Sequence, residues 1–89
     1  MITLPSGLTH AQAAEFARAL KSQVAAQPAE VIADASALQE FDSSALAVLL
    51  ACRREAIAAG KSFSVQGLPA RLHQLASLYG VAELVTAAA

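Results

Sequence analysis

Residues 40–50, with the sequence EFDSSALAVLL, place an acid and two hydroxyls directly before a run of apolar residues. Asp42 fits the N-cap of a helix, because its carboxylate can accept hydrogen bonds from the free amides of the first turn and its charge suits the positive end of the helix dipole. Phe41, just before this cap, can pack on Leu46 as a hydrophobic staple. The stretch therefore predicts a helix over residues 43–59, which Gly60 ends.

The predicted helix is apolar on two opposite sides when successive residues are placed about 100° apart. The side expected to face the core carries Ala45, Val48, Leu49, Cys52 and Ala56. The opposite side carries Ser43, Ala47, Leu50 and Arg54. A helix that is apolar on two sides usually buries both, which favours contact between the second side and a partner protein. A single exposed leucine is also normal on a protein surface, so that alternative stays open.

Ser43 lies at the first position of this helix, on the side expected to contact a partner. A phosphate on its hydroxyl would meet open backbone amides and would add roughly −1.5 to −2 charges to an apolar surface. Ser43 is therefore a candidate phosphorylation site whose modification would release a partner. The adjacent Asp42 counts against this hypothesis, because it makes a further negative charge costly. The candidate partner-binding residues are Asp42, Ser43, Ser44, Ala47, Leu50 and Arg54.

The rest of the chain alternates between predicted strands and helices. Short apolar or alternating runs predict strands over residues 2–4, 31–33 and 62–66. Apolar residues at helical spacing predict further helices over residues 10–27 and 69–79, and Thr9 with Gln12 fits a capping box before the first of them. Residues 35–40 are expected to form a loop. This order predicts an α/β domain with a small mixed sheet and about three helices packed on it.

The composition is typical of one globular domain. A chain of 89 residues is enough for a single domain over residues 1–89, with a frayed end over 87–89. Its 56% hydrophobic and 15% charged residues exclude a disordered chain. The net charge of −1 and the scattered lysines and arginines offer no basic face, so no nucleic-acid partner is expected. Cys52 is the single cysteine, which fits a reducing cytoplasm and a buried core position.

Neither membrane insertion nor catalysis is expected. The longest apolar run, residues 45–52, is too short to cross a bilayer, and the first residues do not form a signal peptide. The sequence has no glycine-rich phosphate loop, and His10 and His73 have no partners at metal-ligand spacing. Asp34 and Asp42 are explained as loop-end and capping residues. No enzyme, cofactor or metal site is therefore predicted, although a small ligand-binding α/β domain stays a further alternative.

The stretch DSSALAVLL, preceded by a strand that ends in an acid, resembles the STAS domain, the family of sulfate-transporter and anti-sigma-factor-antagonist domains. The family motif is commonly Asp-Ser-Ser/Thr-Gly followed by apolar residues, and this sequence departs from it with Ala45 in place of glycine. The first hydroxyl after the aspartate, here Ser43, is phosphorylated in many regulatory members. The later stretch VQGLPARLHQLASLYGVAELV resembles the small STAS subunit of the Mla ABC transporter, which maintains outer-membrane lipid asymmetry.

This resemblance implies a non-catalytic protein and leaves two functions open. The first is a cytoplasmic accessory subunit, peripheral at the inner membrane, that binds the ATPase of a phospholipid-transporting ABC complex through the helix after the motif. The second is an anti-sigma factor antagonist, with an anti-sigma factor or serine kinase as its partner and Ser43 as its switch. The first of two family strands before the first helix is expected to be missing, which would expose a sheet edge that a partner or a homodimer could cover.

Overall fold

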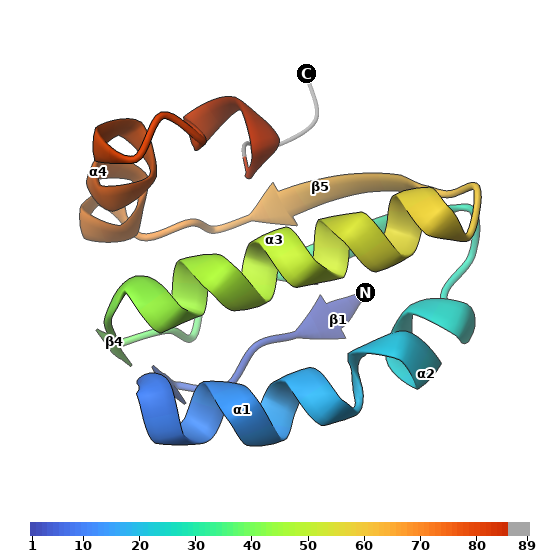
Figure 1. Cartoon of the computed structure of the whole chain (residues 1–89), viewed down its shortest axis with the longest axis horizontal. Helices are drawn as coiled ribbons and strands as arrows, with labels where there is room; N and C mark the ends of the chain where they lie inside the picture. The colour runs from blue at the N-terminus through green and yellow to red at the C-terminus, as the bar shows by residue number, and fades with distance from the viewer. Residues whose placement is uncertain (86–89) are drawn as a thin grey trace.

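Short strands and α-helices alternate along the chain in the computed structural model, which describes residues 1–85 (Figure 1). The elements are β1 (Ile2–Thr3), β2 (Gly7–Leu8), α1 (His10–Arg18), α2 (Leu20–Ala25), β3 (Glu30–Asp34), β4 (Glu40–Phe41), α3 (Ser43–Ala58), β5 (Ser62–Gln66), α4 (Ala70–Leu78) and the 3₁₀ helix η1 (Ala82–Leu84). The predicted α/β fold class, with helices packed on a small sheet, is confirmed. The predicted frayed end at residues 87–89 lies outside the described residues.

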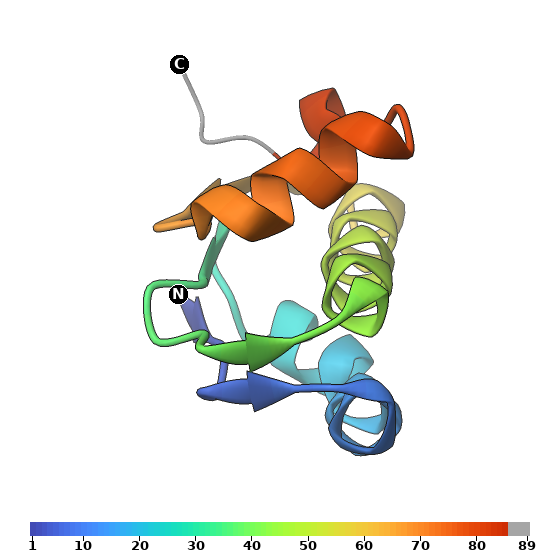
Figure 2. The ribbon, with the colours of Figure 1, turned by 90° about the vertical axis from the view of Figure 1, so that its left-hand side faces the viewer.

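A parallel sheet with the strand order β1-β3-β5 forms the centre of the fold. A second parallel pair joins β2 to β4, beside the amino ends of α1 and α3 (Figure 2). The sheet was expected to be mixed, but every strand pair within residues 1–85 is parallel, because each connection between paired strands contains at least one helix. Strand β1 lies at one edge of the sheet. The absence of an earlier family strand stays a prediction.

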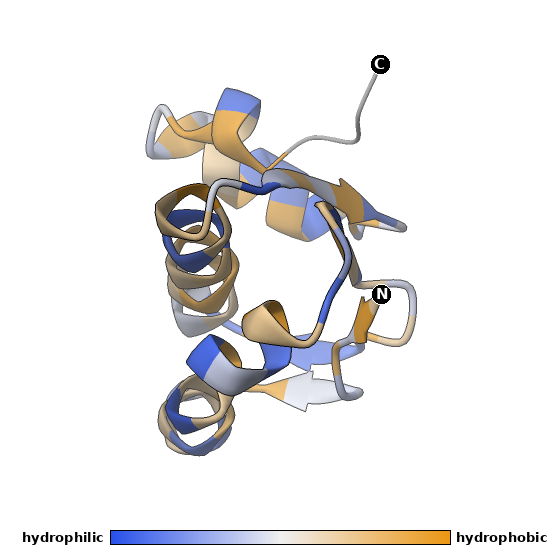
Figure 3. Cartoon of the chain, turned by 90° about the vertical axis from the view of Figure 1, so that its right-hand side faces the viewer, coloured by the Kyte–Doolittle hydropathy of each residue, from blue (hydrophilic) through white to orange (hydrophobic). Residues whose placement is uncertain are grey.

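The helix α3 packs along one face of this sheet and supplies most of the helical core. All five side chains predicted for its inner side are buried, with Ala45, Leu49 and Ala56 completely inaccessible. They belong to one core cluster with Val31 and Ala33 of the central strand, which are also inaccessible. Figure 3 shows the helices α1 and α3 on one side of the molecule and the strands on the other. The helix α3 therefore separates the core from the outer surface.

The amino-terminal helix is interrupted where the sequence predicted one continuous helix over residues 10–27. The interruption is at Ala19, whose N–H bonds to the carbonyls of Ala17 and Phe16 and so closes a tight last turn of α1. The change of direction allows α2 to bury Leu20 and Val24, whereas α1 buries only Ala13. The predicted capping box at the start of α1 is confirmed.

Lys61 satisfies the carbonyl groups at the end of α2, although it lies far away in the sequence, just before β5. Its ammonium group donates to the carbonyl oxygens of Val24 at 2.8 Å, Ala25 at 3.2 Å and Gln27 at 2.6 Å. The last carbonyls of a helix have no partner within the helix, so a cation at this end is favourable. This contact ties α2 to the end of α3 that precedes β5.

Candidate protein-binding site

Asp42 is the N-cap of α3, as predicted, and it also holds the start of α1. Its Oδ1 accepts a hydrogen bond of 2.8 Å from the backbone N–H of Ser44, and its Oδ2 accepts one of 3.3 Å from the backbone N–H of His10. The hydrogen bond from the Ser44 amide is the main reason why the pKa of the Asp42 carboxyl is lowered from its ordinary value of 3.8. One exposed carboxylate therefore fixes the amino ends of two helices beside each other.

The helices α1 and α3 run side by side in the same direction from this shared cap (Figure 1). A shallow groove of about 240 Å³ lies between them. Its walls are His10, Ala13, Ala14 and Ala17 from α1, and Ser44, Ala47, Val48 and Ala51 from α3. This volume is below the roughly 300–1,000 Å³ of small-molecule pockets, and the walls are mostly apolar. The groove is better suited to the side chains of a protein partner than to an enclosed small ligand.

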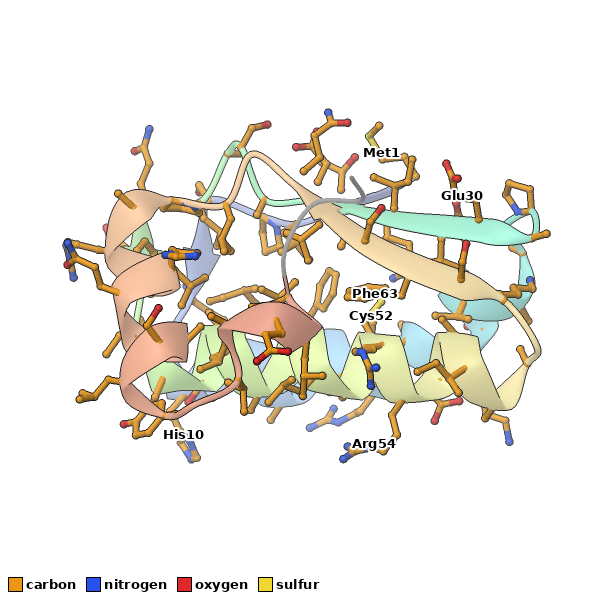
Figure 4. All side chains as sticks on the ribbon, turned by 90° about the horizontal axis from the view of Figure 1, so that it is seen from above. Met1, His10, Glu30, Cys52, Arg54 and Phe63 are labelled. Atoms are coloured by element: carbon orange, nitrogen blue, oxygen red, sulfur yellow. The ribbon has the colours of Figure 1, made fainter. Side chains whose placement is uncertain are left out.

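Five of the six predicted partner-binding residues lie at the groove or on the exposed outer side of α3. Ser44 and Ala47 line the groove, and Asp42 caps the two helices that form it. Ser43 and Arg54 are exposed on the outer side of α3. Figure 4 shows Arg54 and His10 pointing away from the sheet on this side.

Leu50 differs from the other residues of the predicted set. It is only partly exposed, because it packs against the core cluster of its own domain. Leu50 is therefore partly covered by its own domain, and its contact with a partner stays a prediction. Small alanines, rather than Leu50, supply most of the groove walls beside α3.

The contribution of α1 to this surface was missed in the sequence. Ala14 and Ala17 are exposed although they lie on the side of α1 next to α3. The sequence shows that Ala14 and Ala17 are three residues apart and so lie on one side of a helix. It does not show that they line a groove with Ala47 and Ala51, because this depends on the packing of two helices that are far apart in the sequence.

The other candidate chemical groups have structural explanations. Asp34 accepts from the backbone N–H of Ser36 at 3.0 Å and from its hydroxyl at 2.6 Å, and the hydroxyl contact is the main cause of its lowered pKa. Cys52 is buried in the core next to β5 (Figure 4), and burial raises the pKa of its thiol to about 11. Within residues 1–85, no cluster of histidine, cysteine or acidic residues is suited to a metal ion.

The lengths of the helices and the similarity to known proteins bear on what kind of protein this is. None of the helices in the described part of the chain is long and apolar enough to cross a membrane. No curated protein matches the sequence. A family model described as "Mlab, STAS domain" matches residues 1–86, nearly the whole chain. Together with the parallel sheet and the capped helix after the Asp-Ser-Ser motif, this match shows that the chain belongs to the STAS domain family and is MlaB-like.

Proposed function

We propose that this STAS-domain protein is a non-catalytic accessory subunit that binds the ATPase of a phospholipid-transporting ABC complex of the Mla type. In this proposal the protein lies in the cytoplasm and reaches the inner membrane through the complex. The observation that carries the proposal is the open apolar groove between α1 and α3, which begins at the capped Asp-Ser-Ser motif. The MlaB-like family match supports a transporter partner in particular.

A tagged pull-down with quantitative mass spectrometry tests the proposal. The tagged chain is expected to retain an ABC ATPase together with its membrane permease from solubilised membranes. Ala47→Glu, in the wall of the groove, should lower this recovery at least about tenfold, because it places a charge in an apolar contact. Ala70→Glu, at the exposed start of α4, is the matched control and should bind normally. Recovery of neither transporter subunit would contradict the proposal.

Leu50→Asp is a less specific probe of the same surface. The sequence alone predicts that this variant loses the ATPase, whereas Ser43→Ala retains it. Because Leu50 packs partly against the core, the aspartate would also weaken the fold. Its loss of binding is therefore informative only together with an unfolding measurement.

A second function is favoured by the position of Ser43. Its side chain is exposed at the first turn of α3, and within residues 1–85 its hydroxyl makes no hydrogen bond. We propose as the alternative that the protein is an anti-sigma factor antagonist, and that a serine kinase phosphorylates Ser43 to release the partner. Incubation with candidate kinases should then add the mass of one phosphate to the wild-type chain and none to Ser43→Ala. A soluble kinase in the pull-down, in place of a transporter, would favour this alternative.

A further inference from the structure

The two ends of the groove between α1 and α3 differ in charge. At the amino end, the carboxylate of Asp42 is already engaged by the amides of both helices. At the other end, Arg18 follows the groove residue Ala17 directly, and Arg54 lies three residues after the groove residue Ala51. Both arginines are exposed, and the helical spacing places them on the outer rims of the groove, one from each helix.

Neither arginine is neutralised by the domain itself. Within the described residues, the guanidinium groups of Arg18 and Arg54 make no ion pair or hydrogen bond. Of the nearby acids, Glu15 lines a separate hollow with Phe16. Glu55 lies one turn beyond Ala51 on the same side of α3, and together with Lys21 it lines the hollow that follows the groove between α2 and α3. The groove therefore ends between two arginines that make no ion pair within residues 1–85, with Lys21 and Glu55 beyond them.

This arrangement defines the chemistry of a matching segment. The span from His10 to Arg18 is about 12 Å at the rise of an α-helix, which corresponds to about two helical turns. Alanine walls allow the backbone of another helix to approach closely, and guanidinium groups bind carboxylates with paired hydrogen bonds. A groove of this shape fits a helix better than it fits a flat lipid surface.

We infer that the groove binds an amphipathic helix of the partner protein, and that this helix places one or more carboxylates between Arg18 and Arg54. The inference rests on the proposed function only in assuming that the groove is the binding surface. It specifies the partner by its chemistry, so it applies equally to a transporter ATPase and to another protein.

Site-specific photo-crosslinking tests this inference in the full chain. A small diazirine side chain at position 47 is activated in intact cells, and the crosslinked peptide is sequenced by mass spectrometry. We expect a segment with apolar residues at helical spacing and an aspartate or glutamate about two turns or less from the crosslink. A lipid adduct at this position, or a segment without an acid, would overturn the inference.

Charge reversal tests the ionic contact with the partner so identified. Arg54→Glu should raise the Kd about tenfold or more. Arg71→Glu, on the exposed side of α4 and outside the groove, is the control with the same change of net charge, and it should change the Kd less than about twofold. Replacing the acid of the partner with lysine should restore most of the affinity for Arg54→Glu. Equal effects of the two variants, or no rescue, would overturn the inference. A partner that is not an ATPase would instead overturn the proposed function alone.

Discussion

The two sides of α3 have similar amino acids and opposite surroundings. On the inner side, Leu49 and Cys52 lie against the sheet and are buried. On the outer side, Ser43, Ala47 and Arg54 are exposed, and Ala47 forms a wall of the groove shared with α1. Alanine and leucine occur on both sides, so hydropathy alone does not separate core from binding surface. The difference between the sides comes from the elements packed against them, and stability and binding should therefore depend on different residues.

Leu49→Ala should produce the largest difference in stability between the two sides. Leu49 is completely inaccessible, and removing a leucine side chain from a packed core lowers the free energy of unfolding by about 2–5 kcal/mol. That is a large share of the roughly 5–15 kcal/mol typical of a domain. Ala47→Ser, on the outer side, should change the free energy by less than about 0.5 kcal/mol. Urea unfolding measures both, and similar values for the two variants would remove the distinction.

Cys52→Ser should have the next largest effect, again from the inner side. A hydroxyl buried without a partner costs about 1–3 kcal/mol, so urea unfolding should show a moderate loss of stability. Burial also raises the pKa of the Cys52 thiol to about 11, which leaves little reactive thiolate at pH 8. A thiol reagent should therefore label the native protein slowly and the unfolded protein rapidly. A cysteine placed at position 47 in a Cys52→Ala background is the control, and it should react rapidly in the native state.

The sequence predicted the inner side of α3 well, because helical spacing and the apolar residues agree there. The cap at Asp42 and the strand over residues 62–66 were also predictable from local patterns. The pair of strands β2 and β4 was not predictable, because each strand is only two residues long and is stabilised by pairing with the other, which is far away in the sequence. The groove escaped prediction for the same reason. Its alanines are ordinary helix residues until α1 and α3 are brought side by side.

The start of α3 should respond to pH, while its inner side should not. Hydrogen bonds from backbone amides, mainly that of Ser44, lower the pKa of Asp42 below 3.8, and contacts with Ser36 lower that of Asp34. A lowered pKa in the folded state means that the stabilisation is complete above pH 3.8 and is lost as the pH falls through the folded value. Urea unfolding from pH 7 to pH 3 should show this decrease. Asp42→Asn should flatten it in part, and an unchanged profile would contradict the role of this carboxylate.

Ser43→Asp should have the smallest effect on stability and the most informative effect on binding. An acid in the first turn of a helix is favourable by about 0.3–1 kcal/mol, but the negative charge of Asp42 beside it opposes this gain. The free energy of unfolding should consequently stay within about 0.5 kcal/mol of the wild-type value. If the outer side of α3 serves for binding, the added charge at its exposed first residue should still weaken the partner complex, whereas Ser43→Ala should not. A variant that loses stability as well as binding would show that Ser43 belongs functionally with the inner side, and the contrast between the two sides would fail at this position.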